Sequence, residues 1–315
     1  MSRSSGRWSA VHGFSDDEAT RELLRSRPPD GALEWAGAVV GGTVVSASPI
    51  RGGTSSAVHL LRVAVRSGPE LKVVLRRYVR PETKVEEPDI AAREALTLEH
   101  VKAIPVPTPQ LLGVDPSGSE VGDPAILMTL LDGRIDWWPD DVGRWVSQLA
   151  ELLPPIHAVP LPPGKSAHEF SPYAQCSYEP PGWSRTPAVW ERAFEVFHGP
   201  RPATGQVFIQ RDFHPGNVLW KKGEVSGVVD WQAACVGPPS IDVGHCRMNL
   251  FSYGLKVADD FEKAWERASG LSYDPWAEIV SIIGMLDVIR GGTDSDQSPV
   301  EDALARAVAA LRSGP

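Results

Sequence analysis

The 315-residue chain has few cysteines, no long apolar run and no excess of positive charge. Its three cysteines form no C-x-x-C pair and are odd in number, which argues against a disulfide framework and favours a reducing cytoplasmic location. The longest weakly polar run, residues 35–45, is short and interrupted by glycines, so it does not predict a membrane span. The arginines near the N-terminus are followed by no apolar segment, so we expect no secretion signal.

Several catalytic signatures are also missing from the chain. The eight histidines show no metal-ligand spacing, and there is no G-x-S-x-G elbow of the kind that carries a nucleophilic serine. No G-x-x-x-x-G-K-[ST] loop is present, which argues against a P-loop nucleotide site. No internal repeat or low-complexity tract occurs. A chain of this length has room for one large or two medium domains.

Negative charge is concentrated in the second part of the chain. The net charge is −9, and residues 131–315 hold 24 acidic and 16 basic side chains, which account for −8 of it. A nucleic-acid partner is disfavoured, because binding to phosphates needs a basic face. The acidic excess is compatible with a cationic substrate, and equally with a role in solubility alone.

The most informative stretch, Val207–Asp230, reads as a strand, a polar loop and a hairpin. Residues 207–209 form a short apolar strand. Residues 218–220 and 226–229 predict a strand pair, and the turn-rich tetrapeptide 221–224 joins them. The polar loop 210–217 therefore leads directly into one end of a hairpin.

Three oxygen-bearing side chains are predicted to meet at the open end of this hairpin. Asn217 and Asp230 lie equally far from the centre of the turn, so a regular hairpin sets them side by side, with Asp212 on the loop just before. Oxygen ligands are what Mg²⁺ prefers, and a free carboxylate can take a proton from a hydroxyl. The stretch predicts a magnesium site beside a reacting hydroxyl.

The amino-acid sequence of this stretch resembles that of a known family. RDFHPGNVLW, followed by GVVDWQAACVGPPSIDVGH, resembles the aminoglycoside phosphotransferase family, which includes macrolide, homoserine and choline kinases. Asp212 and Asn217 have the D-x-x-x-x-N spacing of the kinase catalytic loop, and Asp230 stands at the place of the metal-binding Asp of D-F-G. The resemblance implies an α+β, protein-kinase-like fold of two lobes, a small one with an antiparallel sheet plus a helix and a large, mainly helical one.

The resemblance also assigns domains and roles. Residues 1–130 would form the nucleotide-binding lobe, with a helical extension over 1–43, and residues 131–315 the catalytic and substrate-binding lobe. Asp212 would be the catalytic base, and Asn217 and Asp230 would hold Mg²⁺. The phosphate donor would be ATP or GTP, and the acceptor a hydroxyl of a small molecule.

A glycine-containing loop resembles the loop that covers the nucleotide. Gly52, Gly53, Thr54 and Ser55 lie between two predicted strands, and their small side chains would let backbone N–H groups approach phosphate oxygens. An ordinary hairpin turn is the alternative interpretation.

Arg76 and Glu94 resemble the ion pair that holds the nucleotide phosphates. Val73–Arg76 matches the kinase V-A-I-K strand with Arg in place of Lys, and Arg can hold two phosphate oxygens. Glu94 lies on a predicted helix, residues 89–100, where the family places the partner of that cation. The alternatives are a surface arginine and a solvated helix charge. A buried strand running into Met128, Thr129 and Leu130 is our candidate for the hinge beside the nucleotide base.

Two departures from the family pattern leave a second interpretation open. Gln210 stands where the family usually has His, and Arg76 where Lys is usual, so a non-catalytic nucleotide-binding pseudokinase is the alternative. Within the enzyme interpretation, a metabolite such as choline or homoserine competes with an antibiotic as acceptor. His157 and Asp242 are expected to be structural, with Asp242 anchoring the catalytic loop.

Overall fold

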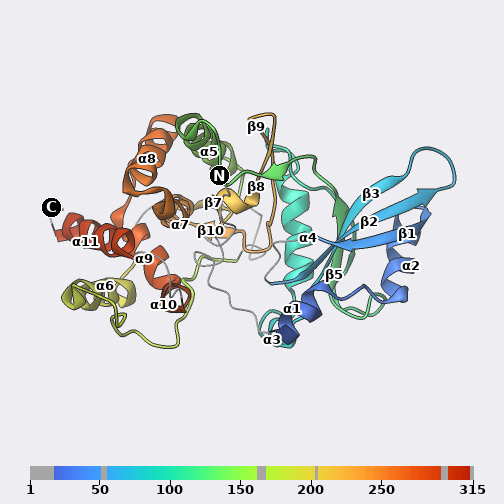
Figure 1. Ribbon diagram of the computed structural model, residues 1–315, viewed down its shortest axis with the longest axis horizontal. Coiled ribbons are helices and arrows are strands. Elements are labelled where there is room, and N and C mark those ends of the chain that lie inside the picture. The colour runs from blue at the N-terminus through green and yellow to red at the C-terminus, as the bar shows by residue number, and fades with distance from the viewer. Residues whose placement is uncertain (1–17, 51–54, 162–167, 203–204, 292–296, 313–315) are drawn as a thin grey trace, which may run out of the picture. The chain divides into compact units, whose positions relative to one another are not determined.

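The computed structural model describes residues 18–50, 55–161, 168–202, 205–291 and 297–312 (Figure 1). The chain divides into two compact units. The sheet unit comprises the described residues up to 133 together with 226–232, and the helical unit comprises residues 134–225 and 233–312. The sequence-based boundary between Leu130 and Leu131 stays a prediction, and the segment that carries Asp230 groups with the sheet unit.

The sheet unit is built on a five-stranded antiparallel sheet. The strands lie in the order β1-β2-β3-β5-β4. Their bounds are β1 Gly42–Pro49, β2 Ala57–Val65, β3 Leu71–Arg77, β4 Leu111–Asp115 and β5 Ala125–Thr129. β3 and β5 pair in the middle of the sheet, so the predicted cation strand and the predicted hinge strand are direct neighbours.

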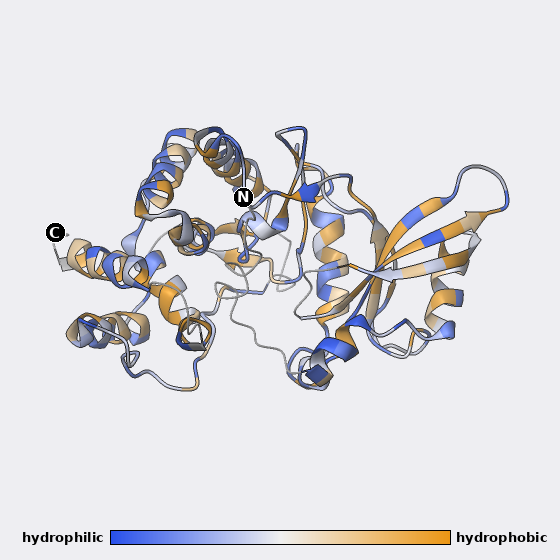
Figure 2. Ribbon diagram, viewed as in Figure 1, coloured by the Kyte–Doolittle hydropathy of each residue, from blue (hydrophilic) through white to orange (hydrophobic). Residues whose placement is uncertain are grey.

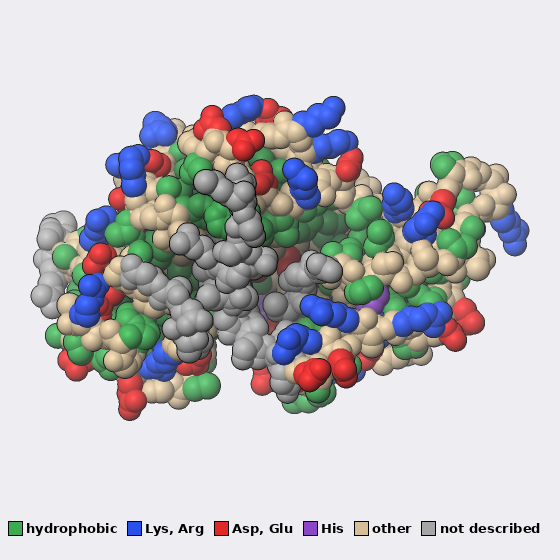
Figure 3. Space-filling model, in the orientation of Figure 1, with side chains coloured by type: hydrophobic (Ala, Val, Ile, Leu, Met, Phe, Trp, Pro, Cys, Tyr) green, Lys and Arg blue, Asp and Glu red, His purple; other side chains and the backbone are tan. Residues whose placement is uncertain are grey.

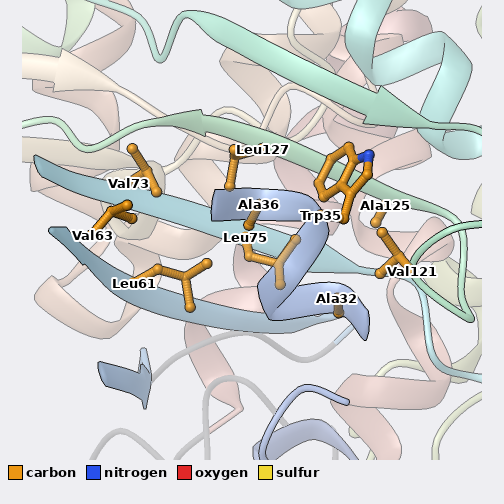
Figure 4. Close-up of a cluster of buried hydrophobic side chains, with 10 residues drawn as sticks. All are labelled: Ala32, Trp35, Ala36, Leu61, Val63, Val73, Leu75, Val121, Ala125 and Leu127. Carbon is orange, nitrogen blue, oxygen red and sulfur yellow. The ribbon is translucent and has the colours of Figure 1, made fainter. Parts of the chain in front are cut away.

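Alternating hydropathy fixes which face of this sheet is covered. Buried and more exposed residues alternate along β2, and Figure 2 shows the same alternation as changes of colour along the strands. One buried cluster joins the sheet to α2, Asp30–Val39, whose Trp35 and two alanines pack on residues from β2, β3 and β5 (Figure 4). Burial of this apolar face is the main stabilising contribution to the unit.

The other helices of the sheet unit are α1 Glu18–Arg25, α3 Pro81–Glu86 and α4 Ile90–Val101. α4 agrees with the helix expected over 89–100, except that Asp89 makes no side-chain capping hydrogen bond and its carboxylate lies 3.6 Å from Arg93. Glu94 is buried on the inner face of α4, which is where an ion pair to the sheet requires it.

The helical unit consists of packed helices and two small sheets. Its helices are α5 Val142–His157, α6 Pro187–His198, α7 Ser240–Leu250, α8 Leu255–Ser269, α9 Pro275–Gly284, α10 Leu286–Gly291 and α11 Ser298–Arg312, with the short 3₁₀ turns η2 Pro215–Asn217 and η3 Phe251–Tyr253. Its strands are β6 Arg134–Ile135, β7 Val207–Ile209, β8 Val218–Lys221 and β10 Cys235–Gly237. β7 pairs with β10, and β6 and β8 form a sheet with β9, Glu224–Val228.

Three sequence-based expectations can be compared directly with the helical unit. The apolar residues that recur at helical spacing in 141–157 predict a helix, which is α5, and Asp141 caps it by accepting the N–H of Arg144. The hairpin is formed by β8 and β9, but its turn is Lys222-Gly223, at φ 55° and 78°, and not the tetrapeptide 221–224. The centre of the turn therefore lies one residue earlier than predicted, and Asn217 and Asp230 are not equally far from it. The strongly apolar residues 275–289 predict a single helix from the sequence, and this prediction is wrong, because the chain breaks at Met285 between α9 and α10.

Charged side chains of both signs are interspersed on the visible face in Figure 3. Across the described ranges, no helix combines the length and apolar character that crossing a bilayer requires.

Candidate active site

The loop that carries Asp212 begins where β7 ends and is held by α7. Gln210 and Arg211 donate their backbone N–H groups to the two carboxylate oxygens of Asp242, at 3.0 and 2.6 Å. Arg211 has a φ of 67°, a left-handed conformation that costs about 1–3 kcal/mol for a residue with a side chain. The hydrogen bond to Asp242 stabilises this conformation, and the strained residue comes directly before Asp212.

Asp242 is itself held from a second helix. His157, the last residue of α5, places its Nε2 3.0 Å from Asp242 Oδ2, and the Asp242 side chain is fully buried. Since a carboxylate only accepts, His157 is the donor. The expectation that Asp242 anchors the catalytic loop and that His157 is structural agrees with these contacts.

Asp212 lies between two donors. Nε2 of His245, on α7, is 3.0 Å from its Oδ1, and Nδ2 of Asn217 is 3.1 Å from its Oδ2. Burial acts to raise the pKa of Asp212, but the hydrogen bond from His245, the nearby His214 and the amide of Asn217 outweigh it and hold the pKa well below its ordinary value. The side chain keeps about a third of its surface, 32 %, exposed. Asp212 is thus an ionised, oriented and reachable carboxylate.

A tight 3₁₀ turn, η2, places Asn217 on this carboxylate. Asn217 Nδ2 also donates to the backbone oxygen of Asp212, at 2.9 Å. The N–H of Gly216 donates to Nδ1 of His214, and a Cβ at Gly216 would come within 2.9 Å of both His214 Nδ1 and the Trp137 ring, so only glycine fits there. Because Asn217 uses its nitrogen for Asp212, its amide oxygen is the atom left to serve a hard cation.

The sheet unit holds the second group of predicted residues. Arg76 Nη1 lies 2.8 Å from Glu94 Oε1 and 2.9 Å from Asp230 Oδ1, so one guanidinium nitrogen serves both carboxylates. The ion pair expected between Arg76 and Glu94 is therefore present, and its role in phosphate binding stays a prediction. The hydroxyl of Tyr78 donates to the other oxygen of Glu94.

Burial dominates the electrostatics of this group. It raises the pKa of Glu94, against the lowering effect of Arg76, and it raises the pKa of the Tyr78 hydroxyl, which stays protonated. Burial acts to lower the pKa of Arg76, but the charges of Asp230 and Glu94 more than compensate and keep it above its ordinary value. Arg76 is therefore a permanent cation in the core of the sheet unit.

Asp230 is positioned by the short segment that joins the sheet unit late in the chain. Val228 donates its N–H to the carbonyl of Pro107, and the indole of the fully buried Trp231 donates to the carbonyl of Val228. Asp230 has a φ of 64°, a second strained position among the predicted site residues. Asn217 belongs to the helical unit and Asp230 to the sheet unit, so a shared metal ion stays a prediction.

The remaining sequence-based predictions concern the nucleotide site. Gly52, Gly53 and Thr54 lie outside the described residues. Ser55 Oγ accepts a hydrogen bond from Gln232 at 2.8 Å, and Gln232 is two residues from Asp230. Met128 and Thr129 end β5, and Leu130 follows with 40 % of its surface exposed. Their contact with a nucleotide base stays a prediction.

Sequence reasoning missed His245, His214 and Tyr78 as contacts of the site residues. A signal for His245 exists, because it follows Asp242 by three residues in one helix, and residues three apart share a helix face. Tyr78 similarly follows Arg76 by two residues, which places both on one side of an extended chain. Only the structure shows which carboxylates these side chains meet.

Comparison with known proteins identifies a family and a fold. The profile described as the phosphotransferase enzyme family matches residues 46–279. The fold resembles macrolide 2′-phosphotransferase MphH from Brachybacterium faecium, with 19 % identity, a TM-score of 0.55, and 89 % of this chain and 98 % of that chain covered.

Two aminoglycoside phosphotransferases are also similar in fold. APH(4)-Ia in a ternary complex with ADP and hygromycin B gives 15 % identity, a TM-score of 0.55, and 85 % and 96 % coverage of this chain and that chain. APH(2″)-IIa in a complex with streptomycin and ATP gives 11 % identity, a TM-score of 0.53, and 87 % and 95 % coverage. The predicted α+β, protein-kinase-like fold class is confirmed by these likenesses.

Proposed function

Because the chain belongs to the phosphotransferase enzyme family and is a small-molecule kinase, we propose that it transfers the γ-phosphate of ATP or GTP to a hydroxyl of its acceptor with Asp212 as catalytic base. The observation that carries this proposal is the environment of Asp212. Its carboxylate is ionised, partly exposed and fixed by donors from His245 and Asn217.

Asp212 acts by accepting a hydrogen bond from the acceptor hydroxyl and then its proton. A strongly lowered pKa makes it a weak base, so the carboxylate mainly orients the hydroxyl, and the proton moves as the bond to phosphorus forms. This suits phosphoryl transfer, in which positioning and charge neutralisation matter more than proton abstraction. Arg76, held by Glu94 and Asp230, supplies a fixed positive charge for the phosphates of the donor.

Asn217 and Asp230 would hold Mg²⁺, which when bound would neutralise the negative charge of the donor phosphates. The donor set fits the ion, since both residues offer oxygen atoms and the amide nitrogen of Asn217 is already used by Asp212. Asp230 keeps about a quarter of its side chain, 26 %, exposed, so its carboxylate is not sealed in the core by Arg76.

The acceptor classes to test first come from the similar structures and from the charge of the chain. Macrolides and the aminoglycosides hygromycin B and streptomycin are named for those structures. The acidic second part of the chain favours a cationic acceptor, which includes aminoglycosides and choline. Homoserine serves as a metabolite comparison.

The decisive experiment is nucleoside diphosphate release with ATP or GTP and Mg²⁺ across this panel, for the wild type, Asp212→Asn and Asp140→Asn. Asp140 is an exposed aspartate of the helical unit, so its substitution is a matched loss of charge. We expect one acceptor class to give turnover, and Asp212→Asn to lower kcat by roughly 10²- to 10⁴-fold because the acceptor of the hydroxyl proton is lost. Asp140→Asn should behave as the wild type.

Turnover that survives in Asp212→Asn would contradict the role of this residue. Nucleotide binding without turnover on any acceptor would instead favour a non-catalytic nucleotide-binding protein. Loss of Mg²⁺-dependent nucleotide binding on replacement of Asp230 by Asn, with the fold retained, is the expected result for the metal assignment.

A further inference from the structure

His245 donates to Asp212 from α7, and what this contact contributes to the reaction goes beyond the assignment of Asp212 as base. Its Nε2 lies 3.0 Å from Asp212 Oδ1, and only 7 % of the residue is exposed. Asn217 donates to the other oxygen, Oδ2. Each oxygen of the carboxylate therefore has its own donor, one from the loop and one from the helix behind it.

We propose that His245 is a positioning residue for Asp212, which fixes the plane of the carboxylate toward the acceptor hydroxyl. This inference rests on the proposed function, because it assigns Asp212 the role of base. The terminal torsion of an aspartate side chain is broad and roughly two-fold, so a single donor leaves the carboxylate free to rotate. Two donors on opposite oxygens hold it in one orientation.

The hydrogen bond also determines that Nε2 of the imidazole carries a proton. The 3.0 Å contact between Asp212 Oδ1 and His245 Nε2 needs one donor, and we assign it to the N–H of the imidazole, with the carboxylate oxygen as acceptor. The atom that faces Asp212 is consequently unable to receive a proton from it. His245 therefore orients the base and does not relay the proton onward.

The position of His245 is determined by the helix that also anchors the loop. Asp242 and His245 are three residues apart on α7 and share a helix face. Asp242 accepts the backbone N–H groups of Gln210 and Arg211, while His245 contacts the side chain of the next residue, Asp212. One helix face thus holds both the backbone and the side chain of the catalytic loop.

Packing of α7 against α9 leaves this face little freedom. A Cβ on Gly244 would lie 2.7 Å from the carbonyl oxygen of Ala277, so the two helices are in backbone contact beside His245. All residues of α7 except Met248 are buried. A displacement of His245 would therefore require α7 itself to move, which makes it a rigid support.

The kinetic test compares His245→Gln and His245→Leu, with Cys246→Ala as the matched control. The amide nitrogen of Gln can replace Nε2 as a donor, whereas Leu cannot. Cys246 is fully buried at the next position of α7, about 100° further around the helix, so its truncation perturbs the same helix without touching the donor. Thermal unfolding of all variants records their stability.

We expect His245→Leu to lower kcat by roughly 10- to 100-fold, the effect of losing a hydrogen bond to a charged group, while the KM for the nucleotide changes by less than about 3-fold. His245→Gln should recover most of the lost kcat, and Cys246→Ala should retain it. A His245→Leu enzyme with wild-type kcat would overturn the proposal, as would equal losses in His245→Gln and His245→Leu.

A second readout needs no acceptor and no turnover. In the full chain labelled with ¹⁵N-histidine, the resonances absent from His245→Gln belong to His245, and we expect them to report a protonated Nε2 whose signal shifts in Asp212→Asn. An unprotonated Nε2 would overturn the proposal. If the wild type turns over no acceptor, both the proposed function and the role of His245 are wrong. If the wild type is active and His245→Leu has the same kcat, only the role of His245 is wrong.

Discussion

At the scale of single residues, Arg76 is a buried cation whose charge is balanced by two carboxylates. It is buried, and its Nη1 is shared by Glu94 and Asp230. Removing one member of a buried ion pair leaves the other charge unpaired, which is far more costly than losing an exposed pair. Replacement of this arginine is therefore expected to change the stability of the protein, whatever its effect on phosphate binding.

We predict that Arg76→Met destabilises the protein by about 3–5 kcal/mol at neutral pH. Burial already raises the pKa of Glu94, and loss of Arg76 removes the charge that opposes this. An acid with a raised pKa in the folded state takes up a proton on folding, so its contribution to stability falls as the pH rises. The deficit relative to the wild type should therefore be larger at about pH 8 than at about pH 5.

Urea unfolding at both pH values measures this difference. The matched control is Arg62→Met. Arg62 lies on β2, the strand next to that of Arg76, and forms an exposed ion pair with Glu70. Arg62→Met should change stability little at either pH. A deficit in Arg76→Met that does not depend on pH would show that Glu94 is not the group left unpaired.

At the scale of elements, α7 holds the loop that carries Asp212. Its Asp242 accepts two backbone N–H groups of the loop, one of them from the strained Arg211. Another aspartate also holds a loop through its backbone N–H groups. Asp115, at the end of β4, accepts the N–H groups of residues 118–121. Only the loop held by Asp242 leads into Asp212.

Asp242→Asn and Asp115→Asn form a matched pair. In both variants one carboxylate oxygen becomes an NH₂ group that cannot accept, so each should lose roughly 1–3 kcal/mol of stability. We predict that Asp242→Asn also lowers kcat by at least about 10-fold, because the loop that carries Asp212 relaxes. Asp115→Asn should keep the wild-type kcat. Steady-state kinetics at a temperature well below both unfolding transitions separates the two effects.

At the scale of the whole molecule, a buried carboxylate joins distant parts of the helical unit. Glu301 of α11 accepts hydrogen bonds from the Ser184 hydroxyl, the Trp190 indole and the backbone N–H groups of Arg185 and Thr186. Burial acts to raise its pKa, but these donors outweigh it and lower the pKa from 4.5 to about 2. α11, α6 and the chain before α6 are thereby held at one point.

We predict a pH-dependent contribution of Glu301 to stability. A carboxyl group with a lowered folded-state pKa stabilises the protein fully above its unfolded value, and this stabilisation is lost as the pH falls from about 4.5 toward about 2. Glu301→Gln should be less stable by roughly 2–3 kcal/mol near pH 7, with the gap narrowing below about pH 4.5 and closing near about pH 2.

Denaturant unfolding of the two proteins across this range is the measurement. Glu195→Gln is the control, because Glu195 is an exposed residue of α6 in an i,i+3 pair with Arg192. The control should follow the wild type throughout. A constant gap between Glu301→Gln and the wild type down to the lowest pH would contradict the assignment of the lowered pKa to this residue.

The sequence by itself determined those features that depend on neighbours in the chain. The turn-rich residues 221–224 between two apolar runs predict a hairpin, although its turn is only Lys222-Gly223, and Asp141 before the periodic residues of α5 predicts where that helix starts. The spacing of Asp212 and Asn217 places both on one short loop, where η2 brings them into contact. Local conformation and capping have short-range causes, so a local pattern suffices. α2 was missed because its residues are apolar around most of the helix, which hides the periodicity.

The tertiary structure alone decided which distant groups share a charge or a hydrogen bond. His245 contacts Asp212, and Glu301 accepts hydrogen bonds from Ser184 and its neighbours. Arg76 pairs with both Glu94 and Asp230. These contacts depend on how elements far apart in the sequence pack. The helix break at Met285 has the same origin, since packing overrides the continuous apolar pattern of residues 275–289. Burial and proximity set the pKa values of these carboxylates, and neither quantity can be read from a local sequence pattern.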